Sequence, residues 1–159
     1  KIRSNHKISL VIAGSGEEKY VKELKKLVLK LGLENNIKFT GYVTEDEKLQ
    51  LLDECIFFIL TSHSDVHPIA VQDALAMGAP VIVTKECDYP EVSEYNAGFE
   101  VDPTIESISE AIEKILSNKS KIQTLSKNAK KLTHEKSLME VKIKEYEKMY
   151  KKAIEINQM

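Results

Sequence analysis

Two aspartates flank the predicted start of a helix in the segment SDVHPIAVQDALAMG, which begins at Ser64. Asp65 precedes Pro68, a residue type favoured in the first turn of a helix, and Asp73 follows within the same helix. The first N–H groups of a helix lack partners inside it, and its dipole favours an anion such as a diphosphate. Carboxylates could also accept hydrogen bonds from sugar hydroxyls. The segment therefore indicates a site for a sugar and a diphosphate, although each aspartate taken alone is more often a cap or a surface charge.

A second candidate is the turn GSGEEK, which follows the apolar run 8–13. A dinucleotide-binding fingerprint would have a third glycine where Lys19 stands, so the pattern does not predict NAD binding. Gly14 and Gly16 still allow a tight turn and close approach of a phosphate or sugar to the backbone. Two interpretations stay open here, a simple turn and a ligand-binding turn.

Histidine and cysteine positions do not indicate a metal site. His63 and His67 have no cluster of Cys or Glu residues around them, and zinc sites generally need such ligands. Cys55 and Cys87 lack metal-type or redox-type spacing, which predicts reduced thiols of a cytosolic protein.

These candidates must be positioned by a framework of strands alternating with helices. Short apolar runs predict strands over 8–13, 37–40, 56–61, 80–83 and 98–101. Helical periodicity predicts helices over 20–31, 44–54, 68–77, 105–116, 120–132 and 136–156. Gly32 and Gly78 should end the first and third helices, and Thr44 with Glu47 should form a capping box. This alternation predicts an α/β fold with a doubly wound parallel sheet of about five strands and a long C-terminal helix.

In folds of this class, ligands bind outside the carboxyl ends of the strands. That rule selects the loops after Ala13, Thr40, Thr61 and Val83, and the segment with the two aspartates follows the third of them. Both candidate turns therefore belong to the edge of the sheet where ligand binding is expected.

Composition limits the class of protein. The chain has 159 residues, 42% of them hydrophobic and 30% charged, with a net charge of −2, which suits a folded domain and argues against nucleic-acid binding. No apolar stretch approaches the roughly 20 residues of a membrane span. Between Lys119 and Lys152 there are eleven lysines and four glutamates. This excess is typical of a solvated helical face, with weak attraction to anionic lipid or to a partner as the alternative.

The segment TSHSDVHPIAVQDALAMGAPVIV resembles the signature of GT-B glycosyltransferases of family 4, the glycosyl transferases group 1. Further landmarks, LVIAGSG, IKFTGYV, DYPEV and AGFEVDP, follow in the family's order. The resemblance covers nearly the whole chain and implies a single Rossmann-like nucleotide-sugar-binding domain over 1–159, the C-terminal half of a GT-B fold. It implies transfer of a sugar from a nucleotide donor with retained anomeric configuration, usually without a metal. It further implies a cytoplasmic enzyme of polysaccharide or glycolipid synthesis, at most peripheral at the inner face of the membrane.

The resemblance implies donor-binding roles for two acidic residues and one apolar residue. Asp65 and Asp73 occupy the two Glu positions of the signature, so Asp65 would act as the catalytic contact to the donor sugar and Asp73 would hold the ribose hydroxyls. Val43 would lie beside the nucleotide base. The Asp-for-Glu replacements shorten each reach by one methylene.

The resemblance also implies that backbone groups contact the remaining parts of the donor, its diphosphate and part of its sugar. The amides around Pro68, near His67 and Ile69, would face the sugar and the diphosphate, while Gly14 and Gly16 would line the diphosphate side. Other departures are Val66–His67 for a Gly-Phe pair and Cys87–Asp88 for Gly-Gly.

The chain starts without an initiator Met, and we expect it to be a fragment. The family's diphosphate-clamping Arg and Lys, its first central strand and its acceptor domain have no counterpart here. Removing that strand from the order 3-2-1-4-5-6 leaves one equivalent to 2-1-3-4-5. Either the strands starting at Ile8 and Ile56 pair directly or another chain fills the gap, and we predict a continuous sheet. The final helix should pack toward the missing domain, and its apolar residues Tyr146, Met149 and Ile154 would support a homodimer of the fragment.

Alternative functions stay open. A nucleotide-sugar 2-epimerase resembles the same architecture, and a non-catalytic nucleotide-sugar-binding or scaffold module would tolerate the departures. A flavodoxin or response-regulator function fits the strand order, but the chain lacks an acidic cluster after its first strand. The main prediction is a donor-binding domain that binds a nucleotide sugar weakly and needs the missing domain to hold a glycan or lipid acceptor.

Overall fold

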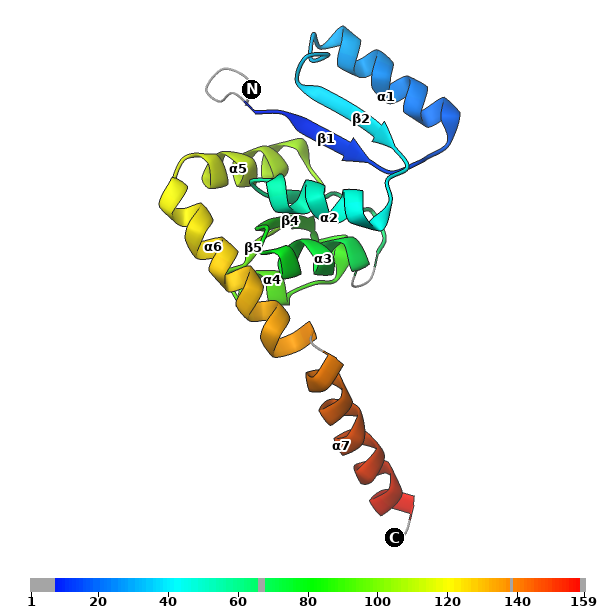
Figure 1. The fold of residues 1–159 in the computed structure, drawn as a ribbon, viewed down its shortest axis with the longest axis vertical. Helices are drawn as coiled ribbons and strands as arrows, with labels where there is room; N and C mark the ends of the chain where they lie inside the picture. Colours follow the sequence, from blue (N-terminus) through cyan, green and yellow to red (C-terminus); the bar gives the residue numbers. More distant parts are fainter. Residues whose placement is uncertain (1–7, 66–67, 138, 158–159) are drawn as a thin grey trace. The chain divides into compact units, whose positions relative to one another are not determined.

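The computed structural model describes residues 8–65, 68–137 and 139–157, and it confirms the α/β class (Figure 1). The strands are β1 (Leu10–Ala13), β2 (Ile37–Gly41), β3 (Phe58–Leu60), β4 (Val81–Thr84) and β5 (Gly98–Val101). The helices are α1 (Glu18–Lys30), α2 (Glu45–Glu54), α3 (Ile69–Met77), α4 (Glu91–Glu94), α5 (Ile105–Leu116), α6 (Lys119–Leu132) and α7 (Met139–Asn157). A 3₁₀ turn, η2 (Lys85–Cys87), follows β4, and a π-helical turn, η3 (Thr133–Ser137), follows α6.

The chain divides into two compact units, Lys1–Leu51 and Leu52–Met159, with the boundary inside α2. In the first unit, β1 and β2 form a parallel pair in which Ile12 lies opposite Phe39. Lys25 of α1 places its ammonium 5.6 Å from the centre of the Phe39 ring, so α1 lies against the strand pair. The first unit is thus a two-stranded ribbon with one covering helix.

The second unit contains the parallel sheet β3-β4-β5. Its central strand β4 is buried on both faces, as expected of a parallel strand between two helical layers. Val81 and Val83 join one apolar cluster with residues of α3, α4 and α6, whereas Ile82 joins another with Ile115 of α5 and Leu125 of α6. Because neighbouring side chains of a strand point to opposite faces, this division shows that the sheet is doubly wound.

The prediction of one continuous sheet is wrong. The strands form a two-stranded sheet, β1-β2, and a three-stranded sheet, β3-β4-β5. A central strand of a parallel sheet needs apolar cover on both faces, but Leu10 and Val11 of β1 remain 44% and 39% exposed. Within each sheet the neighbours are those expected from the sequence, and the interpretation of residues 1–159 as one nucleotide-sugar-binding domain stays a prediction.

Both ends of α3 follow from local chemistry. Pro68 caps its start with an extended backbone, so α3 begins at Ile69, one residue later than predicted. Gly78 ends it in the left-handed conformation, with φ of 82°. The amides of Gly78 and Ala79 donate to the carbonyls of Leu75 and Ala74 at 3.0 and 2.8 Å, which completes a Schellman motif and confirms the predicted stop.

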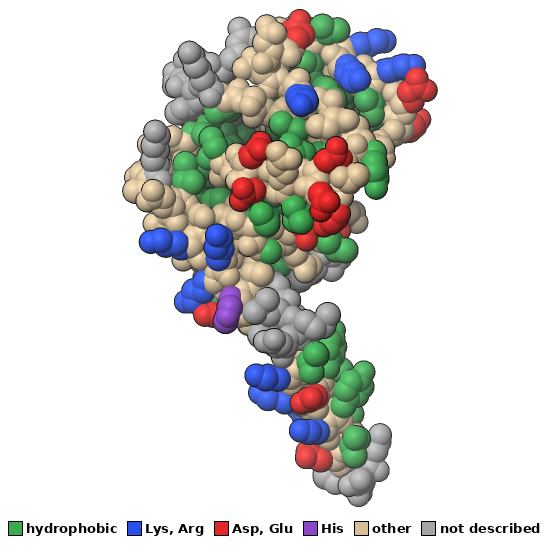
Figure 2. Space-filling model, viewed as in Figure 1, with side chains coloured by type: hydrophobic (Ala, Val, Ile, Leu, Met, Phe, Trp, Pro, Cys, Tyr) green, Lys and Arg blue, Asp and Glu red, His purple; other side chains and the backbone are tan. Residues whose placement is uncertain are grey.

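The last helix, α7, carries large apolar side chains that are exposed, including Tyr146, Met149 and Ile154. In Figure 2, apolar side chains gather along one side of this helix and charged ones along the other. Among the described helices, none combines the length and apolarity needed to cross a bilayer. Pairing of this face with a second copy of the chain stays a prediction.

We expect Gly78→Ala to lower the free energy of unfolding by about 1–2 kcal/mol, because a side chain disfavours the left-handed backbone. The added Cβ would also clash with Cε of Lys130, a flexible group that can move aside. Urea unfolding measures the change. The control is Gly16→Ala, whose Cβ would make an ordinary 3.6 Å contact with Val21 and should change stability by less than about 0.5 kcal/mol. Equal stabilities of the two variants would contradict the prediction.

The capping box at the start of α2 predicts a pH dependence. The Thr44 backbone N–H donates to Glu47 Oε2 at 2.7 Å and the Thr44 hydroxyl does so at 2.9 Å, which lowers the pKa of Glu47 below its ordinary value. A carboxyl whose folded pKa is lowered stabilises the fold above its unfolded pKa, and this stabilisation is lost as the pH falls through the folded pKa. Glu47→Gln should therefore show a smaller loss of stability on acidification than the unaltered chain. Unfolding curves at neutral and acidic pH measure this, with exposed Glu23→Gln as the control that should keep the original pH dependence.

Candidate functional site

The loop between β3 and α3 is pinned to the end of β4. The Thr84 hydroxyl donates to the Ser62 carbonyl at 2.5 Å, and the Asp65 amide donates to the Glu86 carbonyl at 3.1 Å. Thr84 is completely buried. These two bonds join the carboxyl ends of neighbouring strands and fix the backbone from which the Asp65 side chain projects.

The two predicted acidic residues lie on consecutive elements at this edge. Asp65 is in the loop after β3 and Asp73 is in the second turn of α3. Both side chains are half-buried, and both take part in interactions with neighbouring groups. The structure therefore places the two carboxylates on one loop–helix segment of a single unit, as the sequence predicted.

The start of α3 presents backbone donors at the same edge. The amides of Val71 and Gln72 both donate to the Pro68 carbonyl, at 3.0 and 3.3 Å. The amides of Ile69 and Ala70 precede these bonds, in the part of a helix where N–H groups have no helical acceptor. Pro68 is buried, whereas the Ile69 side chain is 73% exposed. His67, also predicted at this site, lies outside the described residues.

The other predicted site residues belong to the first unit. Gly14 follows β1 with φ of 119°, and its amide donates to the Gly41 carbonyl at 2.8 Å, which ties together the ends of β1 and β2. A Cβ on Gly14 would meet no heavy atom within 4 Å, so the space beside this backbone is open. Gly16 lies in the turn that precedes α1. Val43 lies in the loop that connects β2 to α2, and it is half-buried. Gly14, Gly16 and Val43 thus share the carboxyl edge of the β1-β2 pair.

Sequence reasoning did not single out a pair of opposite charges that follow β4 and β5. Lys85 forms an ion pair with Asp102 at 2.7 Å, and both side chains are more than half exposed. The hydrogen bond from Lys85 to Asp102, with the charge of that carboxylate, raises the pKa of Lys85. This lysine is cationic at neutral pH, but its charge is already compensated by a neighbouring carboxylate. The position of Lys85 directly after a buried strand could have marked it as a candidate site residue, whereas its pairing with Asp102 was not predictable from the sequence.

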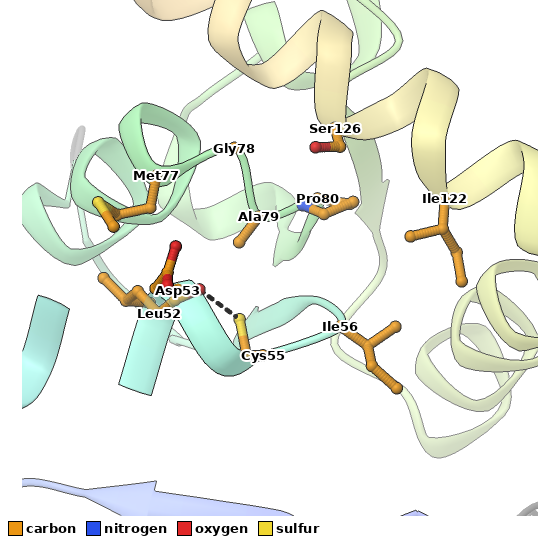
Figure 3. A pocket seen from close by; sticks show the side chains of 10 residues that line it. All are labelled: Leu52, Asp53, Cys55, Ile56, Met77, Gly78, Ala79, Pro80, Ile122 and Ser126. Carbon is orange, nitrogen blue, oxygen red and sulfur yellow. Dashed lines mark hydrogen bonds between the residues drawn. The ribbon is translucent and has the colours of Figure 1, made fainter. Parts of the chain in front are cut away.

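A cavity of about 420 Å³ opens at the amino ends of β3 and β4 (Figure 3). Neither Asp65 nor Asp73 belongs to its lining. It is lined mainly by apolar residues of α2, α6 and the turn after α3, with Cys55 among them. Burial raises the pKa of the Cys55 thiol, which donates to the Leu52 carbonyl at 3.2 Å. Since α/β sheets bind ligands at the carboxyl ends of their strands, we do not assign this cavity to the candidate site.

Both cysteines are free thiols, as predicted from their spacing, and Cys87 is buried beside Thr84. Within the described ranges, no three His, Cys, Asp or Glu side chains come together in a way that could hold a metal ion.

Comparison with known sequences identifies relatives. The profile of the family described as glycosyl transferases group 1 matches residues 1–132. An uncharacterized glycosyltransferase of Methanocaldococcus jannaschii is 30% identical over 158 residues, which cover 98% of this chain and 40% of that protein. The chain thus spans about 40% of the length of this relative.

Solved structures share the fold. A structure of HepE from Anabaena, in complex with UDP-glucose, superimposes with a TM-score of 0.74 and 25% identity, covering 84% of this chain and 38% of that one. The C-terminal domain of a group 1 glycosyl transferase, LpcC, from Francisella tularensis superimposes with a TM-score of 0.76 at 19% identity. That match covers 87% of this chain and 74% of the domain.

Replacing Thr84 tests whether its hydroxyl holds the site loop. Thr84→Val keeps the shape but leaves the Ser62 carbonyl without its donor, so we expect the free energy of unfolding to fall by about 1–3 kcal/mol. Thr84→Ser retains the hydroxyl and serves as the matched control, which should lose less. Urea unfolding compares the variants. A valine variant as stable as the unaltered chain would show that the hydroxyl does not hold the loop.

Proposed function

Because this chain belongs to the glycosyl transferases group 1 family, we propose that it is the donor-binding domain of a retaining, metal-independent glycosyltransferase. The family membership concerns residues 1–132, and the matched relative is more than twice as long as this chain. The sugar donor, the acceptor and the activity of the whole protein are therefore part of the proposal.

The observation that carries the proposal is the pinned loop–helix segment of the second unit. It brings the half-buried carboxylates of Asp65 and Asp73 to the same edge as the first amides of α3. A nucleotide sugar has hydroxyls that can donate to carboxylates and a diphosphate that can accept from helix N–H groups. The donor thus matches both kinds of group at this edge.

Each residue has a role in the proposed reaction. Asp65 contacts the donor sugar, while Asp73 accepts from the ribose hydroxyls. The amides near Ile69, with those around His67 and Pro68, stabilise the negative charge that grows on the departing diphosphate. The roles that the family resemblance gives to Gly14, Gly16 and Val43 of the first unit, beside the diphosphate and the base, stay predictions.

The biological setting is also proposed. We expect the intact protein to transfer the sugar to a glycan or lipid, in the cytoplasm or peripherally at the membrane, using an acceptor domain beyond this chain. HepE was solved with UDP-glucose, so UDP-sugars are the first donors to test. Conversion of UDP-N-acetylglucosamine without an acceptor would instead support the 2-epimerase.

We expect the chain to bind at least one of UDP, GDP and ADP, and Asp73→Asn to weaken that binding by tenfold or more. A neutral amide accepts less strongly from ribose hydroxyls than a carboxylate, and lost charged hydrogen bonds typically cost about 1.5–3 kcal/mol. Isothermal titration calorimetry with each nucleotide measures the affinities. The matched control is Asp53→Asn, an exposed aspartate that lines the cavity at the amino ends of the strands.

Three outcomes would contradict the proposal or a part of it. Absence of binding to every nucleotide and nucleotide sugar by the unaltered chain and by a longer form with an acceptor domain would favour a scaffold module. Equal affinities of the Asp73 and Asp53 variants, with both folded by circular dichroism, would remove Asp73 from the site. Turnover by the chain alone would refute the expectation that it needs the acceptor domain.

A further inference from the structure

The cavity at the amino ends of β3 and β4 is a concave surface that the proposed donor site does not use (Figure 3). Its volume of about 420 Å³ falls in the range of small-molecule sites, roughly 300–1,000 Å³. All of its lining residues lie between Leu52 and Ser126, so the cavity belongs entirely to the second unit. It is therefore a surface of one compact body.

The walls of the cavity are mainly apolar. Ile56 and Pro80 precede the two strands, Met77 is the last residue of α3, and Ile122 comes from α6. In Figure 3, Ile56, Pro80 and Ile122 lie at one end of the cavity and Met77 lies at the other. Ile56 is 50% exposed, so apolar surface at this end is in contact with water. Covering these walls with an apolar group would be favourable, and the flexible thioether of Met77 can adapt to its shape.

The polar side chains of the lining include a carboxylate and no cation. Asp53 and Ser126 contribute oxygen acceptors, whereas the Cys55 thiol already donates to the Leu52 carbonyl at 3.2 Å. Among the described lining residues there is no lysine or arginine. A ligand with its own N–H donors would thus complement the polar part of the cavity.

The end of α2 adds negative charge to the same place. The C-terminal end of a helix is the negative end of its dipole, where cations are stabilising. The last residues of α2 are nevertheless Asp53 and Glu54, and its last turn contains no basic residue. Across the described ranges, no ion pair involves Asp53. The Lys130 side chain packs over Gly78 at the end of α3, so its cation can compensate that helix, while the end of α2 has no cation in its own last turn.

We propose that this cavity binds a small organic cation, with its apolar body against Ile56, Met77 and Ile122 and its ammonium at Asp53. The body removes apolar surface from water, and the ammonium supplies the charge and the donors that the end of α2 lacks. An anion of the same size would be repelled by the carboxylate and by the helix end. The site is separate from the donor site, so the inference does not depend on the proposed function.

Protection of Cys55 from alkylation tests the inference on the full chain. Cys55 lines the cavity, whereas Cys87 is completely buried and should stay unmodified while the chain is folded. Because burial raises the pKa of the Cys55 thiol, labelling with iodoacetamide is done at mildly alkaline pH. Mass spectrometry follows each cysteine while 2-phenylethylamine, 2-phenylethanol or phenylacetate is titrated. These three probes share a phenyl group and differ in charge.

The amine should slow the alkylation of Cys55 at concentrations about fivefold lower than the alcohol, as expected for an exposed ion pair, and phenylacetate should protect least. Asp53→Asn should remove the advantage of the amine over the alcohol. The matched control is Glu106→Gln, which neutralises an exposed carboxylate of α5 and should keep that advantage.

A second pair of variants tests the apolar wall. Ile56→Ser should weaken protection by the amine and by the alcohol by a similar factor, about threefold to tenfold, because both lose the same apolar contact. The matched control is Ile105→Ser, at an isoleucine of α5 that is 81% exposed and lies outside the cavity lining, and it should protect as the unaltered chain does.

Several results would overturn the inference. Equal protection by the three probes would show an apolar surface without preference for a cation, and an amine preference that persists in Asp53→Asn would place the ammonium elsewhere. No protection up to the solubility limit, or no reaction of Cys55 in the free chain, would show that the cavity does not admit a ligand. None of these results bears on nucleotide affinity, so the donor-binding function stands or fails separately.

Discussion

The arrangement of the candidate site depends on the buried strand β4, whose last residue holds the loop that follows the neighbouring strand β3. All four residues of β4 are buried, and the last of them, Thr84, has a hydroxyl that cannot reach water. Its donation to the Ser62 carbonyl satisfies a buried polar group and at the same time sets the path of the β3–α3 loop. The position of Asp65 is thus a consequence of how the core satisfies its own hydrogen bonds.

Local features of the sequence predicted most elements. The helix Ile105–Leu116 and the strand Gly98–Val101 have the bounds that periodicity indicated. The stop at Gly78 and the capping box of Thr44 and Glu47 were also predictable, because each depends on residues at most five positions apart. Signals of this kind act within one turn of backbone, so the sequence displays them directly.

Long-range arrangement was less predictable. The division into two sheets, with β1 and β3 not paired to each other and β1 partly exposed, is not reported by any local pattern. The bond from Asp65 to the Glu86 carbonyl involves backbone groups, which every sequence contains. The pairing of Lys85 with Asp102 joins the ends of two strands that become neighbours only in the sheet. The acidic residues of the candidate site were found because their side chains differ from the apolar strands around them.

The charges of the second unit bear on how tightly it can hold an anionic donor. Asp65 and Asp73 would repel a diphosphate, and the dipole and amides of α3 offset this repulsion only in part. Lys85, the cation nearest in sequence to the end of β4, already has its charge compensated by Asp102. Strong binding of a nucleotide sugar therefore requires further cations near the diphosphate.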